Sequence, residues 1–381
     1  MSTPSFLFIN GAALPAAETP PVTTLLESVP GVYTTTRTHS NASQILFWER
    51  HLRRLANSAR ILCKSNPKLL FQSDRPRVPN SLQLDDSVVW ESIARTLVND
   101  SMRKAMPVAL RERKGDEELA ITALVSGNLE KLSGSEDVDL EKFSRAFDVY
   151  VHVSSYVPPV FGVRGNVARL AVVGRGRDAA ESKYSDWVRR RKSLERLRPH
   201  LATELLLSSD GDQILEGCLT SFFVVCRKVR CQQWQGTTVL FLDLDDASLV
   251  NYRANNLCYT SQRIQDNIEN LSVAEREGSA YSIEIQTAPI SDGVLRGVIR
   301  QVVIDVCSRN KIPLREIAPS WSKRDLWVEA FTTNSLRLLQ HVETIQVPSK
   351  WEMLDSHTWK EVTWEEKQFE EGPGSITAII Q

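Results

Sequence analysis

Apolar runs that end at turn residues predict strands near the start of the chain, and a helix follows them. Phe6–Ile9 is apolar and ends at Asn10-Gly11, a dipeptide typical of tight turns. Gly31–Arg37 is rich in β-branched residues, which favour strands, and Ile45–Phe47 is expected to continue the same sheet. Trp48–Leu62 is predicted to be a helix, because its apolar residues recur at helical spacing.

The same reading predicts two domains. A chain of 381 residues suits two domains better than one. Further strands are predicted at 119–125, 147–153 and 167–173, with helices at 87–106 and 302–307. Ser154–Pro159 contains two prolines and is expected to link a domain of residues 1–157 to a domain of residues 160–350.

The stretch Ser182–Val225 has the clearest internal order. It begins with Lys183 after a loop rich in Gly and Arg, and continues as a basic amphipathic helix. The apolar runs Leu205–Leu207 and Phe222–Val225 flank a turn at residues 210–212 and the sequence Leu215-Glu216-Gly217. Turn residues between short apolar runs predict a β-hairpin.

Composition excludes several classes of partner. The 46 basic and 47 acidic residues leave a net charge of −1, so no global field attracts nucleic acid or a membrane surface. No apolar run approaches the roughly 18–20 residues that a membrane span needs, and the N-terminus lacks the pattern of a signal peptide. The six cysteines show neither CxxC nor paired metal-type spacing, so we expect a reduced, cytoplasmic protein without a metal site.

Two short basic stretches give little support for a phosphate-binding loop or a nucleic-acid-binding patch. Residues 174–177 (Gly-Arg-Gly-Arg) match neither phosphate-loop pattern. The cluster at residues 189–192 is more typical of a solvated helix face than of a nucleic-acid patch, because no aromatic or second basic stripe accompanies it.

The spacing around Lys183 resembles a known family. Lys183-Tyr184-Ser185-Asp186 is followed by Asp210-Gly211-Asp212-Gln213-Ile214-Leu215-Glu216-Gly217, and Lys183 and Glu216 are 33 positions apart. This arrangement resembles the class IV pyridoxal-phosphate aminotransferases, which include branched-chain and D-amino acid aminotransferases and aminodeoxychorismate lyase. Other blocks resemble the family in the same order: 31–37 (GVYTTTR), 51–59 (HLRRLANSA), 286–300 and 325–335.

The resemblance implies the fold of these enzymes. We expect an α+β fold of type IV, with a small N-terminal α/β domain and a larger, β-barrel-like C-terminal domain with helices. Relative to the family, residues of about 64–86 and about 227–282 read as insertions, with a strand expected at 239–244. Residues 351–381 have no counterpart and form an extension of unknown role.

The resemblance also assigns candidate site residues by position. Lys183 would hold pyridoxal 5'-phosphate as a Schiff base and move the substrate proton, and Glu216 would bind the ring nitrogen. The other cofactor-binding candidates, chiefly for the phosphate, are Arg54, Ser221, Gly297, Val298, Ile299, Asn334 and Ser335. Ser221 stands where the family usually has asparagine. The substrate candidates are Tyr33, Arg37, Trp187 and Arg337; the last could equally be a surface ion-pair partner.

Three functions remain open from the sequence. The first is an aminotransferase that acts on an amino acid and a 2-oxo acid. The second is a lyase of the aminodeoxychorismate type that releases pyruvate, because residues 333–336 (Thr-Asn-Ser-Leu) resemble that branch. The third is a catalytically inactive relative used for binding. The sequence identifies neither the donor, the acceptor nor the preference for D or L substrates.

The family is dimeric, and the N-terminal pattern favours the same assembly here. The predicted N-terminal sheet carries more large apolar side chains than one short helix can cover. We therefore expect a homodimer in which a two-fold contact between the small domains buries this surplus.

Overall fold

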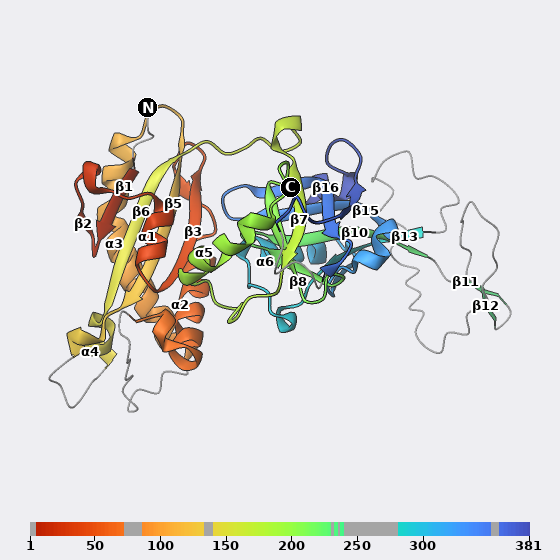
Figure 1. Ribbon diagram of the computed structural model, residues 1–381. Coiled ribbons are helices and arrows are strands. Elements are labelled where there is room, and N and C mark those ends of the chain that lie inside the picture. Colours follow the sequence, from red (N-terminus) through yellow and green to blue (C-terminus); the bar gives the residue numbers. More distant parts are fainter. Residues whose placement is uncertain are drawn as a thin grey trace.

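The computed structural model describes residues 5–71, 86–132, 140–229, 232–234, 237–239, 281–351 and 358–381. Two sheets lie side by side, and the chain crosses from the first to the second after residue 156 (Figure 1). In the ranges given above, no helix is both long and apolar enough to cross a bilayer.

The first sheet is antiparallel and has six strands in the order β2-β1-β6-β5-β3-β4. Its strands are β1 Ser5–Ile9, β2 Ala12–Ala13, β3 Val32–His39, β4 Gln44–Ile45, β5 Glu118–Gly127 and β6 Phe147–Tyr156. The Asn10-Gly11 turn predicted from sequence joins β1 to β2, with φ of 52° and 80°. The strand expected to extend to Phe47 stops at Ile45, because Phe47 adopts a left-handed conformation ahead of the next helix.

Helices cover both faces of this sheet. They are α1 Val22–Ser28, α2 Trp48–Ser65, α3 Ser87–Glu112 and α4 Leu140–Arg145. The apolar residues of α2 and α3 pack with Val32 and Ile121 on one face. On the other face, α1 packs with Leu7, Tyr33 and Leu124. Because neighbouring strand residues point to opposite faces, Val32 and Tyr33 belong to these two different clusters.

The second sheet closes into a barrel, as expected. Its strands are β7 Ala168–Gly174, β8 Glu204–Ser208, β9 Ile214–Gly217, β10 Ser221–Val229, β13 Tyr281–Thr287, β14 Leu314–Glu316, β15 Trp327–Asn334, β16 Leu338–Pro348 and β17 Trp364–Gln368. The order is β14-β13-β10-β15-β16-β7-β8-β9, and β17 pairs with β16. Closure occurs because β9 pairs with both β8 and β10, the latter through Ser221 opposite Glu216.

The remaining elements are short, apart from one helix. They are α5 Asp186–Arg190, α6 Val298–Arg309, α7 Ser375–Ile380, the pair β11 Gln232–Trp234 and β12 Thr237–Val239, and 3-10 helices at Ala16–Glu18, Pro67–Leu69, Leu129–Leu132, Arg164–Asn166, Arg191–Leu197, Ile290–Asp292 and Trp321–Leu326. The predicted basic amphipathic helix is thus one short α-helix followed by a 3-10 helix. It ends at Leu197 because Arg198 precedes a proline and is extended.

The C-terminal extension is part of the barrel. Strand β17 adds to β16, and α7 buries Ile376 and Ile380 against Phe223 and Cys307. The Glu329 carboxylate on β15 accepts hydrogen bonds from the first amides of α7. The extension therefore completes the outer layer of the large sheet, although its sequence matches no block of the family.

Some predictions fall outside the described residues. These include most of the proposed insertion at 64–86, since residues 72–85 are not described. The expected strand at 239–244 and the polar region after it also lie outside, because the described ranges stop at residue 239 and resume at residue 281.

Candidate active site

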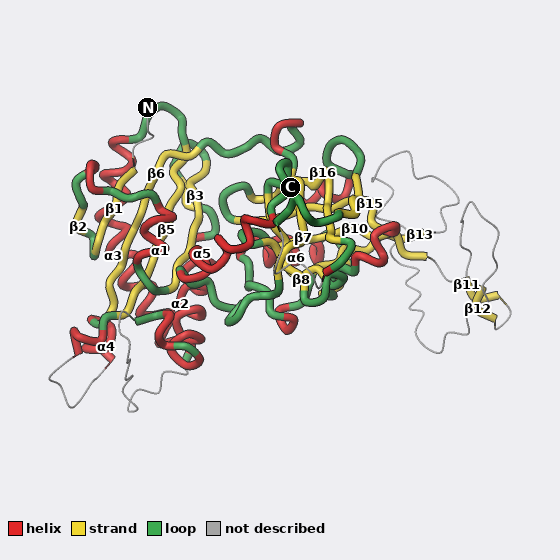
Figure 2. The backbone as a smooth tube through the Cα atoms, viewed as in Figure 1, coloured by secondary structure: helices red, strands yellow, loops and turns green. Residues whose placement is uncertain are grey.

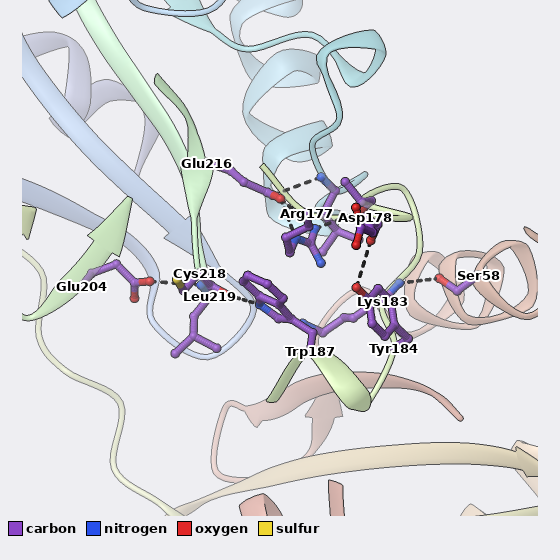
Figure 3. Close-up of polar contacts among 12 residues, drawn as sticks. Ser58, Arg177, Asp178, Lys183, Tyr184, Trp187, Glu204, Glu216, Cys218 and Leu219 are labelled. Atoms are coloured by element: carbon purple, nitrogen blue, oxygen red, sulfur yellow. Dashed lines mark hydrogen bonds and ion pairs between the residues drawn. The ribbon is translucent and has the colours of Figure 1, made fainter. Parts of the chain in front are cut away.

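Lys183 lies on the loop between β7 and α5 (Figure 3), and α5 lies between the two sheets (Figure 2). Its backbone N–H donates to Ser58 Oγ on α2 at 3.0 Å. Its carbonyl accepts from Tyr33 N on β3, also at 3.0 Å, and Tyr184 forms a β-bridge with Val32. These bonds fix a barrel loop against the first sheet and its helix.

The Lys183 amine lies over an aromatic ring and has two other cations nearby. Its Nζ lies 4.5 Å from the centre of the Tyr33 ring. Burial lowers the pKa of Lys183, and nearby Arg54 and Arg177 lower it further, while Tyr33 opposes them. Burial alone would raise the pKa of Tyr33, but Lys183, Arg191 and Arg177 together bring it below its ordinary value. A neutral amine is therefore easier to form here than at an exposed lysine.

Glu216 lies on β9, and its side chain is only 6% exposed. Its Oε1 accepts from Arg177 Nε at 2.9 Å and from Arg177 Nη2 at 2.7 Å. Its Oε2 accepts from the Leu295 amide at 3.0 Å. A carboxylate oxygen can accept two hydrogen bonds, so Oε2 keeps capacity for one more donor.

Arg54 on α2 forms a buried polar cluster with Thr34 and His51. Arg54 Nη2 donates to Thr34 Oγ1 at 2.8 Å, and Thr34 Oγ1 lies 2.7 Å from His51 Nδ1. Burial lowers the pKa of Arg54 to about 10 and that of His51 to well below its ordinary value. Arg54 Nε and His51 Nε2 are buried, and neither has a partner among the residues that the structure describes.

A second set of polar groups surrounds the start of α6. Gly297 caps this twelve-residue helix, and Val298 and Ile299 form its first turn. A Cβ on Gly297 would lie 2.8 Å from Ser221 Oγ, so a larger residue here would force the Ser221 side chain to move. Ser221 pairs with Thr333 across β10 and β15, and Thr333 Oγ1 is buried without a partner in the described part of the chain.

These groups fit an anion such as a phosphate ester. The amides at the start of a helix attract negative charge, and the unsatisfied Arg54 Nε and Thr333 Oγ1 can donate to it. The sequence analysis names Arg54, Ser221 and Gly297 as candidates but assigns no such role to Thr34 and Thr333. Their sequence signal is that they lie in the blocks 31–37 and 325–335, which carry other candidates.

Asn334 and Ser335 lie at the turn between β15 and β16. Asn334 Oδ1 accepts from the amides of Leu336 and Arg337, at 3.0 and 2.8 Å. The Asn334 side chain therefore shapes its own turn. Ser335 is partly buried in that turn.

The two arginines proposed for substrate binding meet at the same turn. Arg37 is buried and donates through Nε to Leu336 O at 2.8 Å. Arg337 donates through Nη1 to Gln340 Oε1 at 2.8 Å. Both influence the pKa of Tyr156, which burial raises. In the ranges described, neither arginine has a carboxylate partner among the ion pairs.

Trp187 makes interior contacts. Its indole N–H donates to Cys218 O at 2.9 Å, and its ring centre lies 5.3 Å from Arg177 Cζ. The Glu204 carboxylate accepts a hydrogen bond from the Leu219 amide, next to Cys218, at 3.0 Å (Figure 3). Burial raises the pKa of Glu204 to about 7. The sequence reasoning assigned no role to Arg177 or Glu204.

Comparisons with known proteins give structural matches only. No family model matches the chain, and no curated protein matches it in sequence. A hypothetical aminotransferase from Mycobacterium tuberculosis, in its PLP-bound form, is 16% identical and has a TM-score of 0.51, over 89% of this chain and 90% of that one. The chain has the fold of these aminotransferases.

Two branched-chain amino acid aminotransferases support the same conclusion. The enzyme from T.th., complexed with N-(5'-phosphopyridoxyl)-L-glutamate, is 14% identical with a TM-score of 0.52, over 99% of this chain and 91% of that one. The Escherichia coli enzyme is 15% identical with a TM-score of 0.50, over 99% and 92%. The fold expected from the sequence is confirmed.

Proposed function

We propose that this chain is a pyridoxal 5'-phosphate-dependent class IV aminotransferase that transfers an amino group between an amino acid and a 2-oxo acid. The observation that carries the proposal is the buried Lys183 amine, which is close enough to the proposed anion site and to the cation paired with a buried carboxylate for both to affect its pKa. Lys183 Nζ faces Tyr33, the anion site contains Arg54, and the carboxylate is Glu216. The structural neighbours described as PLP-bound or phosphopyridoxyl complexes support the choice of cofactor.

The proposed cofactor contacts follow from the geometry. Arg54, the first amides of α6 and the hydroxyls of Ser221 and Thr333 would bind the phosphate, with Ser335 on the adjoining turn. The open position on Glu216 Oε2 would accept the ring N–H. When bound, the cofactor supplies an electron sink for the charge that develops at the substrate α-carbon.

Lys183 would have two roles. Its amine would attach the cofactor covalently and, once released, would take a proton from the substrate α-carbon. The lowered pKa of Lys183 supports the second role, because a base must be neutral to accept a proton. Tyr33 would keep the amine in place through its ring contact.

We further propose that Arg37 and Arg337 bind substrate carboxylates at the mouth of the site. The Arg37 guanidinium donates to Leu336 O in the turn after β15, and Arg337 belongs to the same turn, next to the proposed phosphate site. Each guanidinium has five N–H donors, and neither has a carboxylate partner in the described ion pairs, which suits a carboxylate ligand.

A lyase that releases pyruvate is the second candidate. The sequence Thr333-Asn334-Ser335-Leu336 favours it, and Asn334 organises that turn through two backbone amides. Both candidates require the same lysine and carboxylate. A panel of amino donors, with pyruvate release from aminodeoxychorismate assayed in parallel, separates them.

The cofactor proposal has a direct test. The purified protein should show an absorbance band near the edge of the visible range, and borohydride should bleach it and leave a reduced adduct on Lys183 in a peptide map. An adduct on another lysine contradicts the assignment of Lys183. A protein that neither binds the cofactor nor absorbs in this range would be the third candidate, an inactive relative.

A homodimer remains a proposal, and the first sheet supports it less than expected. Helices α1, α2 and α3 cover both faces of this sheet, so most of its described large apolar side chains are at least partly buried, while Phe47 is exposed. Exposed apolar residues also lie near the boundary of the two proposed domains, 1–157 and 160–350: Val157, Val160 and Val163. Light scattering should give about twice the chain mass of 43.0 kDa; a fully active monomer contradicts the proposal. Cytoplasmic location also remains a prediction.

A further inference from the structure

Arg177 and Trp187 flank Lys183 in sequence, and both bind the segment that carries Glu216 (Figure 3). Arg177 contacts Glu216 Oε1 through two nitrogens, and its Nη2 also donates to Ala180 O at 2.9 Å. Trp187 donates to Cys218 O, two residues after Glu216. The Trp187 ring also lies against the Arg177 guanidinium, which is 5% exposed.

These contacts form two links between the same two segments. Residues 177–187 contain Lys183, and residues 216–218 contain Glu216, so the links set the separation of the amine and the carboxylate. No other ion pair of the described residues involves Glu216. A buried ion pair is weak evidence of a contribution to stability, because apolar side chains of similar volume often stabilise a protein equally well.

The ion pair does provide charge and orientation. A carboxylate buried without a cation takes up a proton readily, whereas one paired with arginine stays ionised. The paired donation to Oε1 and the Leu295 amide on Oε2 also fix the plane of the carboxylate. The one remaining acceptor position therefore has a fixed direction.

We propose that Arg177 is a positioning residue that fixes the Glu216 carboxylate and leaves Oε2 open to the cofactor ring nitrogen, and that Trp187 holds Arg177 in place. This inference rests on the proposed function, because the ring nitrogen belongs to the cofactor assigned there. It names two residues that the sequence motifs leave without such a role.

The first experiment measures cofactor affinity. Apoprotein is titrated with pyridoxal 5'-phosphate for wild type, Arg177→Met, Arg177→Lys and Trp187→Phe, with Arg175→Met as the control. Arg175 lies in the same loop and is exposed. We expect the dissociation constant to rise about tenfold or more in Arg177→Met, less in Arg177→Lys and Trp187→Phe, and not at all in Arg175→Met.

The second readout is the pH dependence of the bound cofactor's absorbance. Arg177→Met removes a positive charge close to the bound cofactor, and a nearby cation disfavours protonation, so the acid-side change in the cofactor spectrum should move to higher pH in this variant. Arg177→Lys, which keeps the charge but not the paired geometry, should restore the pH profile more than the affinity. A merely structural residue would lower the melting temperature without moving this profile.

The outcomes separate the two proposals. If wild type binds the cofactor and Arg177→Met matches Arg175→Met in affinity and profile, the role of Arg177 is overturned and the proposed function stands. If wild type binds no cofactor, the proposed function fails and takes this role with it. If Arg177→Met does not fold, Trp187→Phe and Arg177→Lys decide, and wild-type behaviour in both contradicts the proposal.

Discussion

The carboxylate end and the anion end of the candidate site differ in how fully the chain satisfies their polar atoms. At the carboxylate end, Glu216 accepts three hydrogen bonds from Arg177 and Leu295. At the anion end, Arg54 Nε and Thr333 Oγ1 are buried and have no partner in the described residues. The first end is hydrogen-bonded within the chain, whereas the second keeps two buried donors that the proposed phosphate would bind.

This difference assigns different tasks to the two ends. A preorganised carboxylate can keep a ring nitrogen protonated without rearranging. An unsatisfied buried cation is costly in the free protein, and a ligand that neutralises it recovers that cost on binding. We therefore expect changes at the carboxylate end to affect turnover most, and changes at the anion end to affect affinity.

The largest effect is expected for Lys183, which lies between the two ends. Lys183→Ala removes the proposed base and covalent anchor, so turnover should fall by roughly 10²–10⁴ or more. Steady-state kinetics at saturating cofactor measure this, with Lys192→Ala as a control at an exposed ion pair. Retention of wild-type turnover in Lys183→Ala contradicts the role of this amine.

The next largest effect is expected for Glu216, at the carboxylate end. Glu216→Gln keeps the shape of the side chain but removes the charge that would hold the ring nitrogen protonated. One hydrogen bond to a charged group is worth about 1.5–3 kcal/mol, so turnover should fall by roughly ten- to a hundredfold. Cofactor affinity, measured by equilibrium dialysis, should fall by about the tenfold expected for Arg177→Met, because Arg177 acts through this carboxylate. A variant that loses affinity but keeps turnover reverses the assignment of the two ends.

The third prediction concerns Arg54, at the anion end. Arg54→Met should weaken cofactor binding by about tenfold or more without destabilising the apoprotein, because the buried cation has no carboxylate partner in the described residues. Inorganic phosphate should raise the melting temperature of wild-type apoprotein, and this shift should vanish in Arg54→Met. Arg53→Met is the matched control, since Arg53 is the exposed neighbour on α2. An equal phosphate shift in Arg54→Met excludes the proposed anion site.

At each end of the site, the sequence predicts some of the groups and not others. Arg54 and Gly297 belong to motifs with fixed spacing, and turn residues locate the strands around them. The ion pair of Arg177 with Glu216 spans 39 positions, and no local pattern marks it. Thr333 is similar, because its place beside Ser221 depends on the pairing of β10 with β15. Contacts that arise from tertiary pairing leave no periodic signal in the chain.

The smallest effect concerns Glu204, near the carboxylate end. The Glu204 carboxylate accepts a hydrogen bond from the Leu219 amide, three residues after Glu216. Burial raises its pKa to about 7 from an ordinary 4.5. The folded state therefore binds more protons than the unfolded state between these values, and stability falls as pH rises from about 4.5 to about 7. The full loss is about 3 kcal/mol, at 1.36 kcal/mol for each pKa unit.

Glu204→Gln should remove this loss, because the amide oxygen still accepts from Leu219 and carries no charge. Its melting temperature should exceed that of wild type at pH 8, and the gap should shrink toward pH 5. Glu195→Gln is the control of opposite sign, since Arg198 holds the pKa of Glu195 below its ordinary value. The stability that the Glu195 ion pair with Arg198 contributes is fully present above the pKa of Glu195 in the unfolded state. The difference in melting temperature between Glu195→Gln and wild type should therefore stay constant from pH 5 to pH 8. A constant gap for Glu204→Gln as well would mean that Glu204 does not titrate in this range. The hydrogen bond from Leu219 to Glu204 would then contribute the same stability at pH 5 and at pH 8.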